Sequence, residues 1–150
     1  MDRIWNRGER DRAARMARAR AAGLGRIVEA SRIGELLAAV LVPGDRICIE
    51  GNNQKHADFL AASLAKLDPA VIHDLHVVQS NLALPAHLDL FERGIAKRLD
   101  FCYSGDQGVR MARLVKEGRI EIGAIHTYLE LYSRYFVDLT PRVAFVAAHS

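Results

Sequence analysis

The residues best suited to chemistry form one segment, Gly51-Asn52-Asn53-Gln54-Lys55, directly after the short strand predicted at residues 46–50. A glycine at the end of a strand allows a ligand to approach the backbone, and the N-terminus of a following helix offers free N–H groups to an anion. Asn and Gln side chains can orient a carboxylate or an amide, and Lys55 adds a positive charge. A polar turn in which Asn53 caps the helix explains the segment equally well.

Two titratable residues adjoin strand ends and are the candidate catalytic groups, Glu50 and His126. Glu50 could transfer a proton, although a carboxylate in this position also serves as a hydrogen-bond acceptor that orients its neighbours. His126 could donate a hydrogen bond to a thioester or carboxylate oxygen, and a structural or helix-capping histidine is the equal alternative.

Other reactive residue types are better explained without chemistry. In an extended segment His73 and His76 point to opposite sides, so the sequence predicts no metal site. Cys48 and Cys102 lie in apolar stretches and read as small buried residues. Gly23-Leu24-Gly25 lacks a third glycine and a preceding strand, which excludes a dinucleotide-binding fingerprint.

The elements that must position these residues alternate between short apolar strands and amphipathic helices. This order is typical of an α/β fold with an open, mostly parallel sheet of about five strands and flanking helices. The predicted strands are residues 46–50, 75–79, 98–102, 120–125 and 143–148, and the helices between them are residues 55–67, a helix with Leu88, Phe91 and Ile95, residues 108–117, and residues 128–136.

The carboxyl ends of parallel strands meet at one edge of a sheet, where ligands collect. Four polar segments follow the predicted strands at that edge. They add Ser80, Gly105, Gln107 and Thr127 to the residues 51–55 as candidate substrate-binding groups.

Charge is distributed unevenly between an arm, residues 1–32, and an α/β body, residues 33–150. The arm carries nine Arg and four acidic residues, a net charge of +5, and the body carries twelve Lys or Arg and fourteen Asp or Glu, a net charge of −2. The arm is predicted to be helical. Phosphate binding by its arginines is one interpretation, but Asp2, Glu9 and Asp11 interrupt the positive field, which favours a solvated or subunit-contacting helix.

The chain shows no apolar run of the ~18 residues that a membrane helix needs. No secretory signal is recognised at its start, so we expect a cytoplasmic protein with reduced thiols.

Several segments resemble one known family, the alpha subunits of biotin-independent malonate decarboxylase in the CoA-transferase-like superfamily. The resemblance runs from about residue 33 to residue 146. The segments that carry it are residues 44–55 (GDRICIEGNNQK), 57–60 (ADFL), 71–76 (VIHDLH), 87–96 (HLDLFERGIA), 98–101 (RLDF), 121–128 (EIGAIHTY) and 136–139 (FVDL).

This resemblance implies an acyl-carrier-protein transferase that exchanges the acetyl group of a carrier thioester for malonate. The implied partners are the acyl carrier protein, the other decarboxylase subunits and malonate. The thioester would be carried on the CoA-derived prosthetic group of the carrier, so no cofactor bound by this chain is expected.

Members of the family are several times longer and contain two related α/β lobes, of which this chain resembles the first. We therefore expect a truncated form with little transferase activity on its own. The alternative is a non-catalytic interaction module that docks on partner subunits through its arm and an open sheet edge.

Overall fold

The computed structural model describes residues 4–51 and 57–148. The chain forms two compact units, Met1–Val42 and Pro43–Ser150. The sequence predicts that the arm ends at residue 32. The first unit of the structure extends to Val42 and therefore also contains the helix Ile33–Val40.

The first unit consists of α1 (Ile4–Ala21), a 3-10 turn (Ala30–Arg32) and α2 (Ile33–Val40). Helix α1 ends at Ala21, and the chain then turns at Gly23, whose φ of 71° suits a residue without a side chain. Two arginines of α1 donate to the last carbonyls of α2: Arg15 Nη1 to Val40 O at 2.7 Å and Arg18 Nε to Ala39 O at 2.8 Å. Because those carbonyls have no partner within their own helix, the arginines join the two helices.

The second unit holds a five-stranded sheet in the order β4-β3-β2-β1-β5, in which every neighbouring pair is parallel. This confirms the predicted α/β class. The strands are β1 (Arg46–Ile49), β2 (Leu75–Asn81), β3 (Ala96–Tyr103), β4 (Glu121–Ile125) and β5 (Val143–Phe145). The last strand ends at Phe145, earlier than the predicted residue 148.

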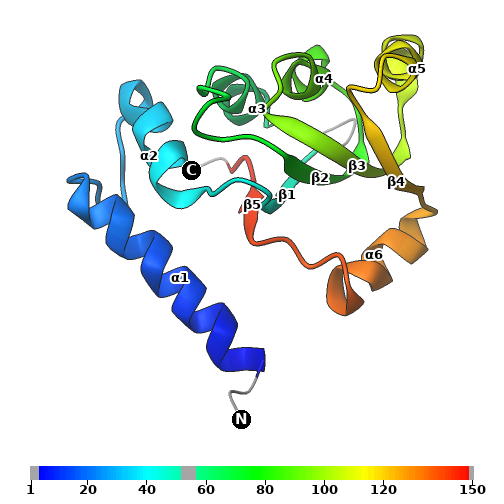
Figure 1. Cartoon of the computed structure of the whole chain (residues 1–150). Helices are drawn as coiled ribbons and strands as arrows, with labels where there is room; N and C mark the ends of the chain where they lie inside the picture. Colours follow the sequence, from blue (N-terminus) through cyan, green and yellow to red (C-terminus); the bar gives the residue numbers. More distant parts are fainter. Residues whose placement is uncertain (1–3, 52–56, 149–150) are drawn as a thin grey trace. The chain divides into compact units, whose positions relative to one another are not determined.

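Helices α3 (Asp58–Leu64), α4 (Pro85–Glu92) and α5 (Gly108–Lys116) cover one face of the sheet, and α6 (Tyr128–Val137) lies on the other (Figure 1). Ile95, expected on the second of these helices, follows it instead, because α4 ends at Glu92 and Gly94 turns the chain with φ 76°.

The crossing of α6 to the opposite face goes together with a reversal in the order in which the strands are added to the sheet. The chain adds β2, β3 and β4 successively on one side of β1 and then returns to place β5 on the other side. The sheet therefore has a switch point between β1 and β5, and the carboxyl ends of strands at a switch point form the usual ligand crevice of open α/β sheets.

Candidate functional site

The group of residues closest to the switch point surrounds Gly51, which is buried at the carboxyl end of β1. Ser80, in β2, donates a hydrogen bond from Oγ to the carbonyl oxygen of Gly51 at 2.8 Å. Two of the residues predicted to bind substrate, Gly51 and Ser80, are thus in direct contact, although 29 residues separate them.

Gly51 sits where no side chain fits. A Cβ atom would lie 2.3 Å from Gln79 Nε2 and 2.8 Å from the carbonyl oxygen of Asn81. Both neighbours belong to β2, so the backbone of Gly51 lies directly against the end of that strand. The close approach explains the glycine at this position.

Gln79 and His87, which the sequence analysis did not single out, build the floor beneath Gly51, and both are fully buried. Gln79 Nε2 donates to Asn81 O at 2.8 Å and lies 2.8 Å from His87 Nδ1. The N–H of Leu84 also points to His87 Nδ1, at 3.4 Å, so this nitrogen acts as an acceptor. The only sequence signal for this pair was that Gln79 and His87 are polar residues within an otherwise apolar strand and the helix that follows it.

Glu50, predicted as a catalytic group, spans the switch point. Its Oε2 accepts a hydrogen bond from the N–H of Ala147 at 2.9 Å, and its own N–H donates to Phe145 O at 2.8 Å. The carboxylate therefore ties the chain after β1 to the chain after β5. In this structure Glu50 acts as the hydrogen-bond acceptor that the sequence analysis described as the alternative to proton transfer.

The predicted substrate-binding residues Asn52, Asn53, Gln54 and Lys55 lie outside the described residues. The description resumes at Ala57, immediately before α3, and the N–H of Ala57 points back to the carbonyl oxygen of Glu50 at 3.4 Å. Gly51 and Ala57, the described residues on either side of this segment, thus both lie near the carboxyl end of β1.

Gly105 and Gln107 follow β3 in a 3-10 turn, Gly105–Gln107. Gly105 has a φ of 50°, and a Cβ at this position would lie 3.9 Å from Asn81 Oδ1. It therefore adjoins the end of β2. Gln107 precedes α5, and its side chain makes no hydrogen bond to the helix N-terminus.

His126 and Thr127 belong to a second group, on the face of the sheet that α6 covers. The side chain of His126 is fully buried, with Nε2 2.7 Å from Asp100 Oδ1. Glu130 Oε1 lies 3.2 Å from His126 Nδ1, but this nitrogen has no partner in hydrogen-bond geometry. Thr127 Oγ1 accepts a hydrogen bond from the N–H of Glu130 at 3.1 Å and caps α6. Within residues 4–51 and 57–148, no hydrogen bond or ion pair joins this pair to Gly51 or Ser80.

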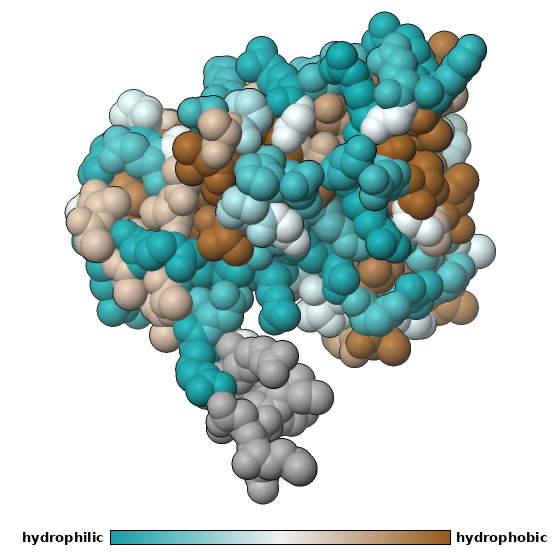
Figure 2. Space-filling model, in the orientation of Figure 1, coloured by the Kyte–Doolittle hydropathy of each residue, from teal (hydrophilic) through white to brown (hydrophobic). Residues whose placement is uncertain are grey.

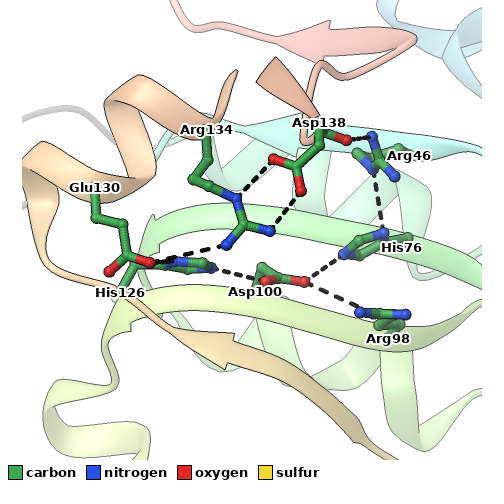
Figure 3. A network of polar contacts seen from close by, with 8 residues as sticks. All are labelled: Arg46, His76, Arg98, Asp100, His126, Glu130, Arg134 and Asp138. Atoms are coloured by element: carbon green, nitrogen blue, oxygen red, sulfur yellow. Dashed lines mark hydrogen bonds and ion pairs between the residues drawn. The ribbon is translucent and has the colours of Figure 1, made fainter. Parts of the chain in front are cut away.

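The centre of this second group is Asp100, a buried carboxylate in β3 that accepts from two histidines (Figure 3). Its Oδ2 lies 2.6 Å from His76 Nε2 and 3.8 Å from Arg98 Nε. Arg46 Nε donates to His76 Nδ1 at 3.2 Å, which places the proton of neutral His76 on the nitrogen that faces Asp100. Burial lowers the pKa of His76, and the hydrogen bond to Asp100 partly opposes this effect.

The same network reaches both ends of α6. Arg46 Nη1 donates to the carbonyl oxygen of Asp138, just past the helix. Asp138 also accepts two hydrogen bonds from Arg134, both at 2.6 Å. The polar network therefore reaches α6 through Glu130, which lies near His126, and through Asp138, which accepts from Arg46, while Arg134 joins Glu130 and Asp138 along the helix (Figure 3).

Gly123 makes room for Asp100. A Cβ at Gly123 would lie 2.0 Å from Asp100 Oδ2, and the β3–β4 register shifts between Leu99 and Asp100. Sequence reasoning missed both residues. The available signal was an acidic residue inside the apolar strand Leu99-Asp100-Phe101, which requires a buried partner.

Among the described residues, no cluster of three or more His, Cys, Asp or Glu could hold a metal ion. Burial raises the pKa of the Cys48 thiol, whose Sγ lies 3.4 Å from Tyr135 Oη, and it also raises the pKa of Cys102. A raised pKa disfavours the thiolate. Both cysteines are half-buried, whereas the sequence suggested that they are buried. In the described part of the chain, no helix combines the length and the apolar character needed to cross a bilayer.

Comparison with known proteins places this geometry in a family. The family model for "Malonate decarboxylase, alpha subunit, transporter" matches residues 4–150. An acetyl-S-ACP:malonate ACP transferase from Malonomonas rubra is 50% identical over 149 residues, which are 99% of this chain and 27% of that relative. The chain therefore spans roughly a quarter of the length of this relative.

Solved structures agree with the sequence comparison. A crystal structure of a Pseudomonas malonate decarboxylase hetero-tetramer in complex with malonate matches with a TM-score of 0.89 and 47% identity, over 96% of this chain and 26% of that chain. The alpha subunit of a malonate decarboxylase from Acinetobacter baumannii matches with a TM-score of 0.84 and 45% identity, over 90% of this chain and 26% of that chain.

Proposed function

The chain belongs to the malonate decarboxylase alpha-subunit family, and on this premise we propose that it supplies part of a site that exchanges acetyl for malonyl on the thioester of an acyl carrier protein. The relative from Malonomonas rubra is named for this exchange. The substrate site is centred on Gly51, at the switch point between β1 and β5.

One observation carries this proposal: Gly51 is packed so closely on the end of β2 that a Cβ would lie 2.3 Å from Gln79 Nε2. Its carbonyl is also held by Ser80 Oγ at 2.8 Å. These contacts fix the position of Gly51, the first residue of the proposed substrate-binding segment. The amides, hydroxyl and ammonium group of this region suit a dicarboxylate and a polarised thioester carbonyl.

The exchange proceeds in two balanced steps. In the first step a carboxylate oxygen of malonate attacks the acetyl carbonyl carbon and the C–S bond breaks. The carrier is released as a thiolate, and the other product is an acetyl–malonyl mixed anhydride. The thiolate then attacks the malonyl carbonyl carbon, and acetate leaves as the C–O bond breaks. Neither step needs a protein nucleophile or net proton transfer. The protein contributes positioning and stabilisation of the developing oxyanion.

In this proposal the prosthetic group belongs to the carrier protein, so the chain binds it as substrate and holds no cofactor of its own. Malonate, the carrier and the other decarboxylase subunits are the proposed partners. The hetero-tetramer among the solved relatives supports the last of these.

Glu50 and His126 have different proposed roles. Glu50 positions the ends of β1 and β5 through its hydrogen bond to the N–H of Ala147. His126 acts through the start of α6, because its side chain is fully buried against Asp100. Replacing His126 with Ala should therefore lower exchange by disturbing that region.

The test uses a chimera in which this chain replaces the matching part of the Malonomonas rubra transferase. The measured quantity is acetyl-carrier-dependent exchange of labelled malonate. We expect Asn52→Ala combined with Asn53→Ala to lower kcat/KM about a hundredfold, the size typical for lost oxyanion donors. Ser80→Ala should lower it about tenfold, because Gly51 loses a positioning contact.

A matched serine provides the control. Ser63 Oγ donates to Phe59 O within α3, at 2.7 Å, so Ser63→Ala removes a hydrogen bond of similar length without touching the site. Exchange should stay unchanged in this variant. Unchanged exchange after both asparagine replacements would show that the Gly51 segment is only a turn and would reject the proposed site.

A further inference from the structure

Helix α6 has apolar side chains on two sides, yet the structure buries only one of them. Its inner side places Leu131 against Val78 and Leu139, with Cys102 and Tyr135 packed beside them. Only Glu130, Ser133 and Arg134 among its ten residues, YLELYSRYFV, are polar and not aromatic. A helix that is apolar on nearly all sides is typically buried on all sides.

The outer side of α6, together with the last residue of β4, forms an exposed apolar patch, defined here as the outer patch. It comprises Ile125, Tyr128, Leu129, Tyr132, Phe136 and Val137, which are 63–78% exposed. Tyr132 and Phe136 pack edge to face with ring centroids 5.5 Å apart. Hydrophobic residues are visible at the right-hand and lower edges of Figure 2, where Figure 1 places β4 and α6.

This patch is larger than isolated exposed apolar residues would produce. Five of the six lie on or beside successive turns of one ten-residue helix, and six side chains of this size, mostly exposed, present roughly several hundred Å² of apolar surface, an extent that marks a protein contact. The patch continues onto β4, which forms the edge of the sheet and has a free side for further contacts. Aromatic and aliphatic residues without charges among them are typical of permanent interfaces.

We propose that the outer patch docks against the part of a malonate decarboxylase alpha subunit that lies outside the region this chain matches. That part is large, because the match covers only 27% of the Malonomonas rubra relative and 26% of the Pseudomonas alpha chain. The surface is as apolar as a permanent interface. A segment of the same polypeptide forms a permanent interface more readily than a transient partner does, because the covalent link keeps its effective concentration high. This inference uses the family membership and does not depend on the acyl exchange proposed above.

The test co-expresses the tagged 150-residue chain with the untagged remainder of the Malonomonas rubra transferase and measures how much remainder is recovered on the tag. The disrupting variant is Leu129→Glu combined with Phe136→Lys. These replacements leave the net charge unchanged and place an acid in the first turn and a base in the last turn, where the helix dipole favours them. We expect recovery to fall at least about tenfold.

The matched control lies on α5, on the opposite face of the sheet. Val109 is 86% exposed and Val115 is 37% exposed, and they occupy the first and last turns of that helix. Val109→Glu combined with Val115→Lys makes the same chemical change and should leave recovery unaltered. Far-UV circular dichroism of each chain alone verifies that both variants retain the fold.

A second measurement uses only the wild-type chain. Hydroxyl-radical labelling of Leu129, Tyr132 and Phe136 should fall at least about threefold when the remainder is bound, while labelling of Val109 should not change. The proposal is wrong if the wild-type chain recovers no remainder, or if the α6 and α5 variants recover equal amounts. It is also wrong if the chain alone forms a dimer that the α6 variant dissociates, because the outer patch would then bind a second copy.

Discussion

Two glycines show how single residues shape the polar groups of this protein. Gly51 permits the end of β1 to lie against Gln79, and Gly123 permits β4 to pass Asp100, where an added Cβ would lie 2.0 Å from the carboxylate. In each case the neighbour is a buried polar side chain with several fixed hydrogen bonds. Because the neighbour cannot move without losing those bonds, the absent side chain is a structural requirement.

His76 gives a residue-scale prediction on pH. Burial lowers its pKa below the value of ~6.5 expected in an unfolded chain. The unfolded chain therefore binds the proton more readily. Lowering the pH from about 7.5 to about 5.5 should then decrease the free energy of unfolding through this group. Urea unfolding of the wild type and of His76→Gln at several pH values measures this contribution.

The variant His76→Gln should show the smaller decrease over this pH range. His73→Gln is the matched control, because the His73 side chain is 44% exposed and pairs with the neighbouring, exposed Asp74. It should retain the wild-type pH dependence. Equal pH dependence in the wild type and His76→Gln would contradict the prediction.

At the scale of elements, α6 is the helix on which the second polar group depends. It is capped by Thr127, joined to Asp100 through His126, and held at its far end by Arg46 and Asp138. Only Leu131 of this helix is fully buried. Polar contacts therefore contribute much of the interaction that orients α6 on the sheet in this chain.

Loss of the cap is the prediction at this scale. Thr127→Ala removes the acceptor of the Glu130 N–H, which should cost about 1 kcal/mol of unfolding free energy. Thr127→Ser keeps a hydroxyl in the same place and should stay within about 0.5 kcal/mol of the wild type. Urea unfolding followed by circular dichroism measures both, and an equal loss in the two variants would count against the cap.

At the scale of the whole molecule, the chain consists of two compact units, and all five strands belong to the second. The sheet, its four flanking helices and both polar groups lie between Pro43 and Ala148. The arginines of the first unit that the structure pairs with α2, Arg15 and Arg18, act within that unit.

This division predicts that residues 43–150 fold without residues 1–42, because every strand pairing of the sheet is made within them. We expect far-UV circular dichroism typical of an α/β protein and one cooperative urea transition. The full chain serves as the reference. Gradual unfolding of the shorter chain without a defined transition would show that the sheet requires the first unit.

The sequence by itself determined the alternation of strands and helices, because apolar spacing and turn residues are local properties. It located the Gly51 segment at a strand end, and it placed Gly105 and Thr127 after other strands, whereas Ser80 lies within β2, which extends to Asn81. It could not show that Gln79 and His87 lie beneath Gly51, or that Asp100 lies between His76 and His126. Those meetings depend on strand register and on which face each helix crosses. Tertiary structure alone decides both, through the shift between Leu99 and Asp100 and the return of the chain through α6 to β5.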